Sequence, residues 1–218
     1  MILFEITGSE ASPAYQTLEI ANGNRHYDFL RSMVLASLEI ERPFLSQAII
    51  KALNYHAIAC LHVAAGEFRP CRVRVGEYEP PDHFRVQALM DDLVNQVNRH
   101  WGSADPVALA TYVLWRINHI HPFINGNGRT ARAAAYFVLC VATEAWLPGD
   151  IILPELLRRN RDAYVKALQN VDHSNASGNL DLTPLHTLVS QLLSEQLSSA
   201  GIKPSDSNDA PPDGAGSG

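Results

Sequence analysis

The chain has 218 residues, of which 46% are hydrophobic and 18% are charged, and its formal net charge is -6. This length suits one domain of ordinary size, and the composition excludes a highly charged, disordered chain. The acidic balance argues against broad nucleic-acid binding, which usually needs a basic face. We therefore do not expect a nucleic-acid partner.

The cysteines and the apolar runs indicate where the protein works. Cys60, Cys71 and Cys140 are odd in number and form no CxxC pair, which excludes a disulfide framework and a zinc cluster and favours a reducing compartment. No apolar run reaches the roughly 18 residues that cross a membrane, and the first residues lack the basic segment of a secretory signal. We expect a cytoplasmic protein without a membrane partner.

The N-terminal half begins with short apolar runs and then becomes helical. Residues 2–6 and 17–20 fit two short strands, and Asn22-Gly23-Asn24 is a turn signal. Apolar residues at helical spacing predict helices over 27–42 and 45–65, with Gly66 as the C-cap of the second. The alternation in 71–75 then predicts a short strand.

The C-terminal half is predicted to be helical to its tail. Asp82 and Asp105-Pro106 are start signals, and the two segments on either side of residue 124 are apolar on most sides, as central buried helices are. The tail is rich in Gly, Pro, Ser and Asp, so we expect it to be disordered. The predicted helices cover 83–100, 106–120, 128–144, 154–171 and 183–199.

The loop between the two central helices carries the most chemistry. A Gly-Asn-Gly backbone leads into a helix N-terminus, which favours an anion, and Arg129 and Arg132 project from the same face of the first turn. His121, at the other end of the loop, is placed to act as a base. This combination predicts a polyphosphate site with a basic histidine beside it.

Residues 121–132 resemble the Fic signature, H-x-F-x-[D/E]-G-N-G-R-x-x-R, and the helical pattern from Tyr27 to Ser199 resembles the Fic fold. The signature residues that match are His121, Phe123, Gly126, Asn127, Gly128, Arg129 and Arg132. The resemblance implies an all-α domain with a short β-hairpin flap, to which the two N-terminal runs could add a small β-hairpin. We expect an N-terminal extension over 1–26, the Fic domain over 27–200 and a tail over 201–218.

The resemblance also implies a protein adenylyltransferase, which moves AMP from ATP to a Ser, Thr or Tyr hydroxyl of a target protein. His121 would deprotonate that hydroxyl. The backbone of Gly126, Asn127 and Gly128 would hold the phosphates, with Asn127 at the α-phosphate.

The remaining signature residues receive roles in the same way. Arg129 would bind the β-phosphate and stabilise charge on the leaving pyrophosphate, as positioned cations do in phosphoryl transfer. Arg132 would reach the γ-phosphate, and Phe123 would anchor the loop in the core.

Asn125 stands where the family has the carboxylate that holds Mg²⁺ between the phosphates. An amide oxygen is a neutral and weaker ligand for this cation. Three interpretations stay open: Mg²⁺ is held mainly by ATP, the ligand is not ATP, or catalysis is lost. The resulting alternatives to AMP transfer are AMP removal, transfer of another phosphate-containing group, and a non-catalytic nucleotide-binding regulator.

Two further segments resemble parts of Fic proteins. Ser37 and Glu41 match the inhibitory motif [S/T]-x-x-x-E-[G/N] except that Arg42 replaces its last residue, and Glu41 would pair with Arg132. Residues 68–76 resemble the flap that would hold a target segment by strand pairing, through Cys71, Arg72, Val73, Arg74 and Val75.

Three other residues and the oligomeric state are indicated by weaker patterns. Tyr164 and Asp172 lie where Fic proteins contact the base and ribose, whereas His119 is expected to serve packing or capping. A homodimer is plausible from the family alone.

Overall fold

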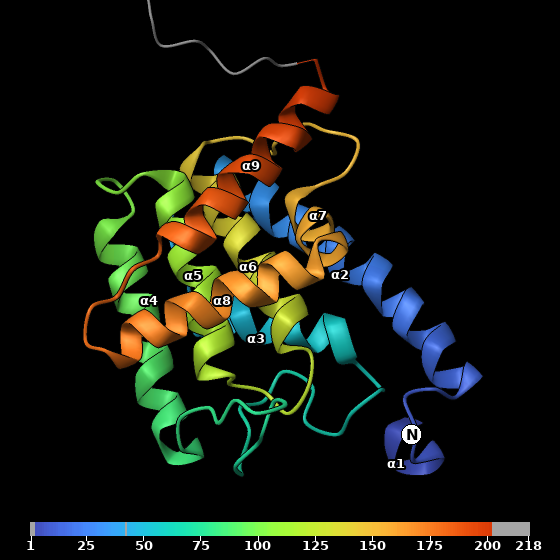
Figure 1. Ribbon diagram of the computed structural model, residues 1–218. Coiled ribbons are helices and arrows are strands. Elements are labelled where there is room, and N and C mark those ends of the chain that lie inside the picture. Colours follow the sequence, from blue (N-terminus) through green and yellow to red (C-terminus); the bar gives the residue numbers. More distant parts are fainter. Residues whose placement is uncertain (1–2, 42, 202–218) are drawn as a thin grey trace, which may run out of the picture.

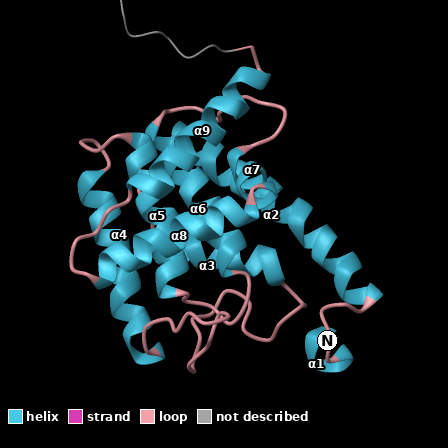
Figure 2. Ribbon diagram, viewed as in Figure 1, coloured by secondary structure: helices cyan, strands magenta, loops and turns pink. Residues whose placement is uncertain are grey.

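The computed structural model describes residues 3–41 and 43–201, and within them the protein is built from helices without a strand (Figure 2). The all-α class is therefore confirmed. None of the helices described is both long enough and apolar enough to cross a bilayer. Residues 202–218, which hold nearly all of the predicted disordered tail, lie outside the described residues.

The core is formed by helices α5 (Pro106–Ile120) and α6 (Asn127–Ala142), with the other helices packed around them (Figure 1). Twelve of the 16 residues of α6 are buried, which agrees with the prediction of a central helix. Surrounding them are α3 (Gln47–Ile58), α4 (Val86–His100), α7 (Leu153–Arg159), α8 (Arg161–Ala176) and α9 (Thr183–Ser199).

The N-terminal region is helical, so the predicted strands and the N-terminal hairpin were wrong. A short helix α1 (Leu3–Thr7) precedes α2 (Pro13–Glu39), a 27-residue helix along the edge of the bundle (Figure 1). Ser12 caps α2, since its side chain accepts a hydrogen bond from the N–H of Tyr15, and Pro13 occupies the first turn, where proline is tolerated. The apolar pattern predicts a start near Tyr27, whereas the helix begins 14 residues earlier at the Ser12-Pro13 start signal.

The turn predicted at Asn22 is also absent, because this side chain has a tertiary role. Asn22 is fully buried within α2, and its Nδ2 donates to the carbonyl of Ala59 at 2.9 Å. A side chain that bonds to a neighbouring helix no longer competes for its own backbone, which is what gives asparagine its preference for turns.

Two other element boundaries differ from prediction. Helix α3 ends at Ile58 instead of near residue 65, and Cys60 has a positive φ of 61°. The predicted helix over 154–171 is two helices, because Asn160 leaves the helical region with ψ at 40°.

The segment between α3 and α4 is a long irregular connection. The strand predicted over 71–75 is absent, and only two isolated antiparallel bridges occur, between Phe68 and Phe123 and between Val75 and Tyr78. The flap is therefore a tight turn at residues 75–78. It is followed by a 3₁₀ turn, η1 (His83–Arg85), that leads into α4.

Candidate active site

The candidate site is the loop that joins the two central helices. Helix α5 ends at Ile120, and His121 follows in the left-handed region, with φ at 51° and ψ at 59°. Gly126 begins the next helix with φ at 79°. A Cβ on Gly126 would lie 2.8 Å from Cγ2 of Ile58, so both the conformation and the space at this position require glycine.

Two buried asparagines brace this loop. Asn127 is 2% exposed, and its side chain bonds to both backbone groups of Phe123: its Oδ1 accepts from the N–H at 2.9 Å and its Nδ2 donates to the carbonyl at 2.8 Å. Asn54, from α3, donates to the carbonyl of Asn125 at 2.9 Å. Phe123 itself is fully buried, so the loop is tied to the core at its middle as well as at both ends.

His121 opens into a cavity of about 420 Å³, within the size range of small-molecule sites. The signature contributes three residues, the flap turn contributes two, and the rest come from α5, α7 and α8. The lining residues are Val75, Tyr78, Asn118, His121, Gly128, Arg132, Leu157, Arg158, Arg161, Tyr164, Val165, Leu168, Gln169 and Asp172.

The imidazole of His121 is neutral at neutral pH. Its pKa is lowered to about 4, mainly by burial and also by the nearby guanidinium of Arg69, although a hydrogen bond with the Asn118 backbone raises the pKa. A neutral imidazole can accept a proton. His121 is thus chemically able to act as a base on a hydroxyl brought into the cavity.

Cations dominate the charge of the cavity although the whole chain is acidic. Arg132, Arg158 and Arg161 line it, while its carboxylate, Asp172, is held by the indole N–H of Trp115 at 2.9 Å. The buried Nε of Arg132 has no hydrogen-bond partner among the described residues. A cavity that concentrates positive charge attracts anions, so this one suits a phosphate-rich ligand.

Comparison with known proteins agrees with this geometry. The family model described as Fic/DOC family matches residues 44–139. A structure of a Fic domain containing signaling protein from Bacteroides thetaiotaomicron superposes with a TM-score of 0.67 at 26% identity, over 90% of this chain and 76% of that one. The chain contains a Fic domain.

Curated relatives give the family a named activity. The protein adenylyltransferase Fic of Drosophila persimilis is 42% identical over 71 residues, which are 32% of this chain and 14% of that protein. The relative of the same name from Drosophila yakuba is 39% identical over 111 residues, or 50% of this chain and 22% of that protein. The match thus spans less than a quarter of these relatives, and it supports AMP transfer at the level of the family.

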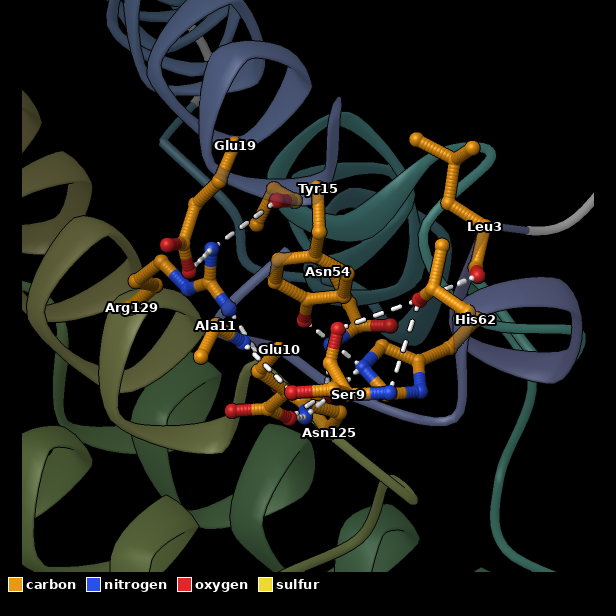
Figure 3. Close-up of polar contacts among 12 residues, drawn as sticks. Leu3, Ser9, Glu10, Ala11, Tyr15, Glu19, Asn54, His62, Asn125 and Arg129 are labelled. Carbon is orange, nitrogen blue, oxygen red and sulfur yellow. Dashed lines mark hydrogen bonds and ion pairs between the residues drawn. The ribbon is translucent and has the colours of Figure 1, made fainter. Parts of the chain in front are cut away.

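The structure divides the Fic signature between two environments. His121, Gly128 and Arg132 face the cavity, whereas Arg129 does not line it. Arg129 pairs with Glu19 of α2, with NH1 3.0 Å from Oε1, and its NH2 donates to Oδ1 of Asn125 at 3.2 Å (Figure 3). Arg129, which was predicted to bind the β-phosphate, therefore points toward the N-terminal helix α2.

Asn125 belongs to the same polar network, which we call the arm network. Its Nδ2 lies 2.9 Å from Oε1 of Glu10 and 2.9 Å from Nε2 of His62 (Figure 3). The hydroxyl of Tyr15 also lies 2.9 Å from Nε2 of His62. Glu10, Tyr15 and Glu19 all come from the first 20 residues, so the N-terminal region covers one side of the signature loop.

This network does not fit a metal ion held by the protein. Both polar atoms of Asn125 are already bonded, and Arg129, a cation, is one of the partners. Within residues 3–41 and 43–201, no three His, Cys, Asp or Glu side chains gather as a metal site would need. Asn125, which was predicted to be a weak Mg²⁺ ligand, instead links the loop to Glu10 and Arg129 in this structure.

Asn127 also differs from its predicted role at the α-phosphate. Both polar atoms of its side chain are bonded to Phe123, and a buried amide would lose these two bonds if it turned to a ligand. The side chain of Asn127 instead closes the loop between Phe123 and the start of α6.

The predicted contact between Glu41 and Arg132 is absent. Ser37 and Glu41 border a separate cavity with Val141 and Glu144, at the C-terminal end of α6, whereas Arg132 lies in its second turn. Val141 lies nine positions after Arg132 along the helix, about 13 Å at 1.5 Å per residue. Ser37 and Glu41 match the inhibitory motif in residue type. However, α2 is oriented so that its N-terminal half, rather than its C-terminal end, contacts the signature loop.

The flap brings one of its five predicted residues to the cavity, Val75. Arg72 instead pairs with Asp82, with Nε 2.6 Å from Oδ1. Tyr78, which sequence reasoning missed, lines the cavity, and its hydroxyl donates to the carbonyl of His119 at 2.7 Å.

His119 and Tyr164 hold the far side of the cavity in place. Nδ1 of His119 lies 2.8 Å from Oδ1 of Asp172, so the packing role expected for His119 is a polar one. Tyr164 is 4% exposed and accepts a hydrogen bond from Nδ2 of Asn118 at 2.8 Å. Both Tyr164 and Asp172 line the cavity.

Proposed function

We propose that this Fic-domain protein is a protein adenylyltransferase that transfers AMP from ATP to a Ser, Thr or Tyr hydroxyl of a target protein. One observation carries the proposal: a neutral histidine and an arginine, His121 and Arg132, share one cavity at the start of a buried helix. The matched curated relatives are named protein adenylyltransferases.

The reaction follows from these groups. The target hydroxyl gives its proton to His121, its oxygen forms a bond to the α-phosphorus, and the bond to the leaving pyrophosphate breaks. Negative charge then grows on the phosphate oxygens, where the N-terminus of α6 and the guanidinium of Arg132 stabilise it. Arg161 adds positive charge at the same cavity, whereas Arg158 is paired with Glu155.

ATP is the substrate in this proposal, and the cavity suits its other parts. Tyr164 keeps its proton because burial raises its pKa to about 12, and Asp172 offers a carboxylate oxygen beyond the one that Trp115 and His119 bind. We assign these two side chains to the nucleoside. Any Mg²⁺ enters as part of the ATP substrate, since Asn125 is not free to hold it.

The arm network supports a restraint on activity by the N-terminal helix. Arg129 must leave Glu19 before it can bind a phosphate, so the ion pair opposes the productive arrangement. This restraint takes the place of the one predicted from Glu41, which the structure keeps away from both signature arginines.

A second candidate function is a nucleotide-binding regulator without catalysis. The engagement of Asn125 and Arg129 by Glu10 and Glu19 favours it, because two signature positions are then withheld from the nucleotide. The regulator would bind the nucleotide in the same cavity as the transferase, but no bond to the α-phosphorus would form.

The deciding experiment incubates the chain in cell lysate with ATP labelled at the α-phosphate or at the γ-phosphate. AMP transfer predicts protein-bound label from α-labelled ATP alone, lost in His121→Ala and kept in His100→Ala, a control at an exposed histidine of α4. Label from γ-labelled ATP that is lost in His121→Ala would refute AMP transfer, because label supplied by kinases of the lysate does not depend on this histidine. Tight ATP binding without any label would establish the regulator instead.

A further inference from the structure

Arg69 is a buried arginine without a carboxylate partner among the described residues. It is 2% exposed and lies in the irregular connection between α3 and α4. A buried guanidinium must donate its hydrogen bonds to nearby acceptors, because leaving a buried charged donor without a partner destabilises the folded state. Its partners therefore show what it holds together.

All the acceptors are backbone carbonyls, and they come from three places. At the end of α5, Nε donates to His121 at 2.8 Å and NH2 to Ile120 at 3.4 Å. At the start of the flap, NH1 donates to Cys71 at 3.0 Å, and at its end NH2 donates to Pro81. One side chain thus closes the base of the flap and fastens it to the end of the central helix.

The backbone of Arg69 adds a further link to the signature loop. Its N–H donates to the carbonyl of Pro122 at 2.8 Å, and the neighbouring Phe68 forms an antiparallel bridge with Phe123. Arg69 therefore bonds to the carbonyls of Ile120 and Pro122, the residues before and after His121.

The end of α5 is where such a cation acts most strongly. The last carbonyls of a helix lack intrahelical donors and carry its negative dipole end, and the fork of a guanidinium can reach several of them at once. His121 is also held in the left-handed region, which a non-glycine residue adopts only when its surroundings fix it. The bond from Arg69 to its carbonyl fixes the orientation of that peptide and hence the direction of the imidazole.

We propose that Arg69 is a positioning residue that sets the catalytic histidine and the flap as one unit. Arg69 does not itself line the cavity that the proposal assigns to the nucleotide. It fixes the peptide that carries His121 and the height of the turn at Val75 and Tyr78 over the same cavity. The inference rests on the proposed function, which supplies the reaction that this placement serves.

Lysine cannot replace arginine in this role. A single ammonium has three donors around one nitrogen, whereas the acceptors of Arg69 lie on different sides of a planar fork. Arg69→Lys should keep the charge but lose the connection between the flap and α5. Arg69→Gln should lose both, and the pKa of His121 should rise because the guanidinium now lowers it.

The test compares Arg69→Lys, Arg69→Gln and the control Arg99→Gln, which changes an exposed arginine of α4. We measure the single-turnover rate of labelling from α-labelled ATP across pH, the affinity for a non-hydrolysable ATP analogue, and the NMR titration of His121. The other charged and titratable groups near His121 stay unchanged in every variant: Tyr78, His119, Arg132, Arg158, Arg161, Tyr164 and Asp172.

We expect both Arg69 variants to label at least tenfold more slowly, with analogue affinity within threefold of the wild type. In Arg69→Gln the acid limb of the rate profile and the NMR titration of His121 should both move to higher pH. Methylguanidinium, but not methylammonium, should restore labelling in Arg69→Ala. Wild-type rates and an unmoved titration in both variants would overturn the proposal.

A measurement on the unaltered chain covers the case in which the variants do not fold. The amide protons of Arg69, Tyr78 and His121 are bonded to Pro122, Val75 and Ile117, and one unit should open with a shared exchange rate. Exchange at clearly different rates would contradict the inference. If wild type gives no label at all, the proposed function fails, while the His121 titration and the exchange rates still decide the role of Arg69.

Discussion

His26 should make the chain lose stability in mild acid. This residue of α2 is 3% exposed, and its Nε2 has no partner among the described residues. Its pKa is lowered to about 3, mainly by burial and also by the nearby cations Arg129 and Arg132. The unfolded chain binds a proton on this histidine near pH 6.5, but the folded chain does not.

The magnitude follows from the two pKa values. Between about pH 6.5 and pH 3 the unfolded state takes up a proton that the native state refuses, so the free energy of unfolding falls as the pH is lowered. With those pKa values the loss at pH 5, relative to pH 7, is roughly 2 kcal/mol, a sizeable share of the stability of an ordinary domain. Below pH 3 both states are protonated and the loss stops growing.

The assay is urea unfolding at pH 7 and pH 5 for the wild type, His26→Leu and the control His100→Leu. His26→Leu should be about as stable as the wild type at pH 7, because it removes a buried nitrogen that has no partner. It should lose about 2 kcal/mol less than the wild type on acidification, whereas His100→Leu should follow the wild type. Equal losses in all three proteins would refute the reasoning.

Two further predictions concern the signature loop. Glu19→Gln should weaken the ion pair with Arg129 and raise labelling from α-labelled ATP severalfold. Glu41→Gln, whose side chain lies near the C-terminal end of α6, should leave the labelling unchanged. A rise in labelling only in Glu41→Gln would contradict the arm network as the restraint. Gly126→Ala should lower the free energy of unfolding by about 1–3 kcal/mol through backbone strain and the contact with α3. Gly23→Ala, inside α2 with open space around it, should instead raise that free energy by about 0.5–1 kcal/mol, and denaturant unfolding of both variants checks the pair.

The sequence predicted the central helices because burial dominates them. Helix α5 has the predicted bounds, from a capping Asp105 to Ile120, and α6 is apolar on nearly every side. In such segments the hydrophobic pattern and the start signals agree, so local and tertiary preferences point to the same structure.

The N-terminal region could not be predicted in this way because its stability comes from tertiary contacts. Asn22 and Gly23 favour a turn locally, yet Asn22 is satisfied by the end of α3 and the helix continues. The Ser12-Pro13 pair was the available start signal. The part of α2 that packs against the signature loop decides which acidic residue reaches the signature arginines. This packing depends on the path of the whole chain.

The site itself was predicted only in part for a similar reason. A motif gives residue types and spacing but not the direction of each side chain. His121 and Arg132 share the cavity, while Asn125 and Arg129 turn to Glu10 and Glu19. Arg69 lies outside the signature, and no short pattern marks an arginine whose partners are carbonyls from distant segments.

The most direct test of the central claim is tandem mass spectrometry of the Glu19→Gln chain and its lysate partners after incubation with ATP. We predict an added AMP group, joined through a phosphodiester to a Ser, Thr or Tyr oxygen, and its loss in the double variant Glu19→Gln with His121→Ala. Equal AMP addition with and without His121, or addition of a phosphate group alone, would contradict the claim that this histidine activates a hydroxyl for AMP transfer.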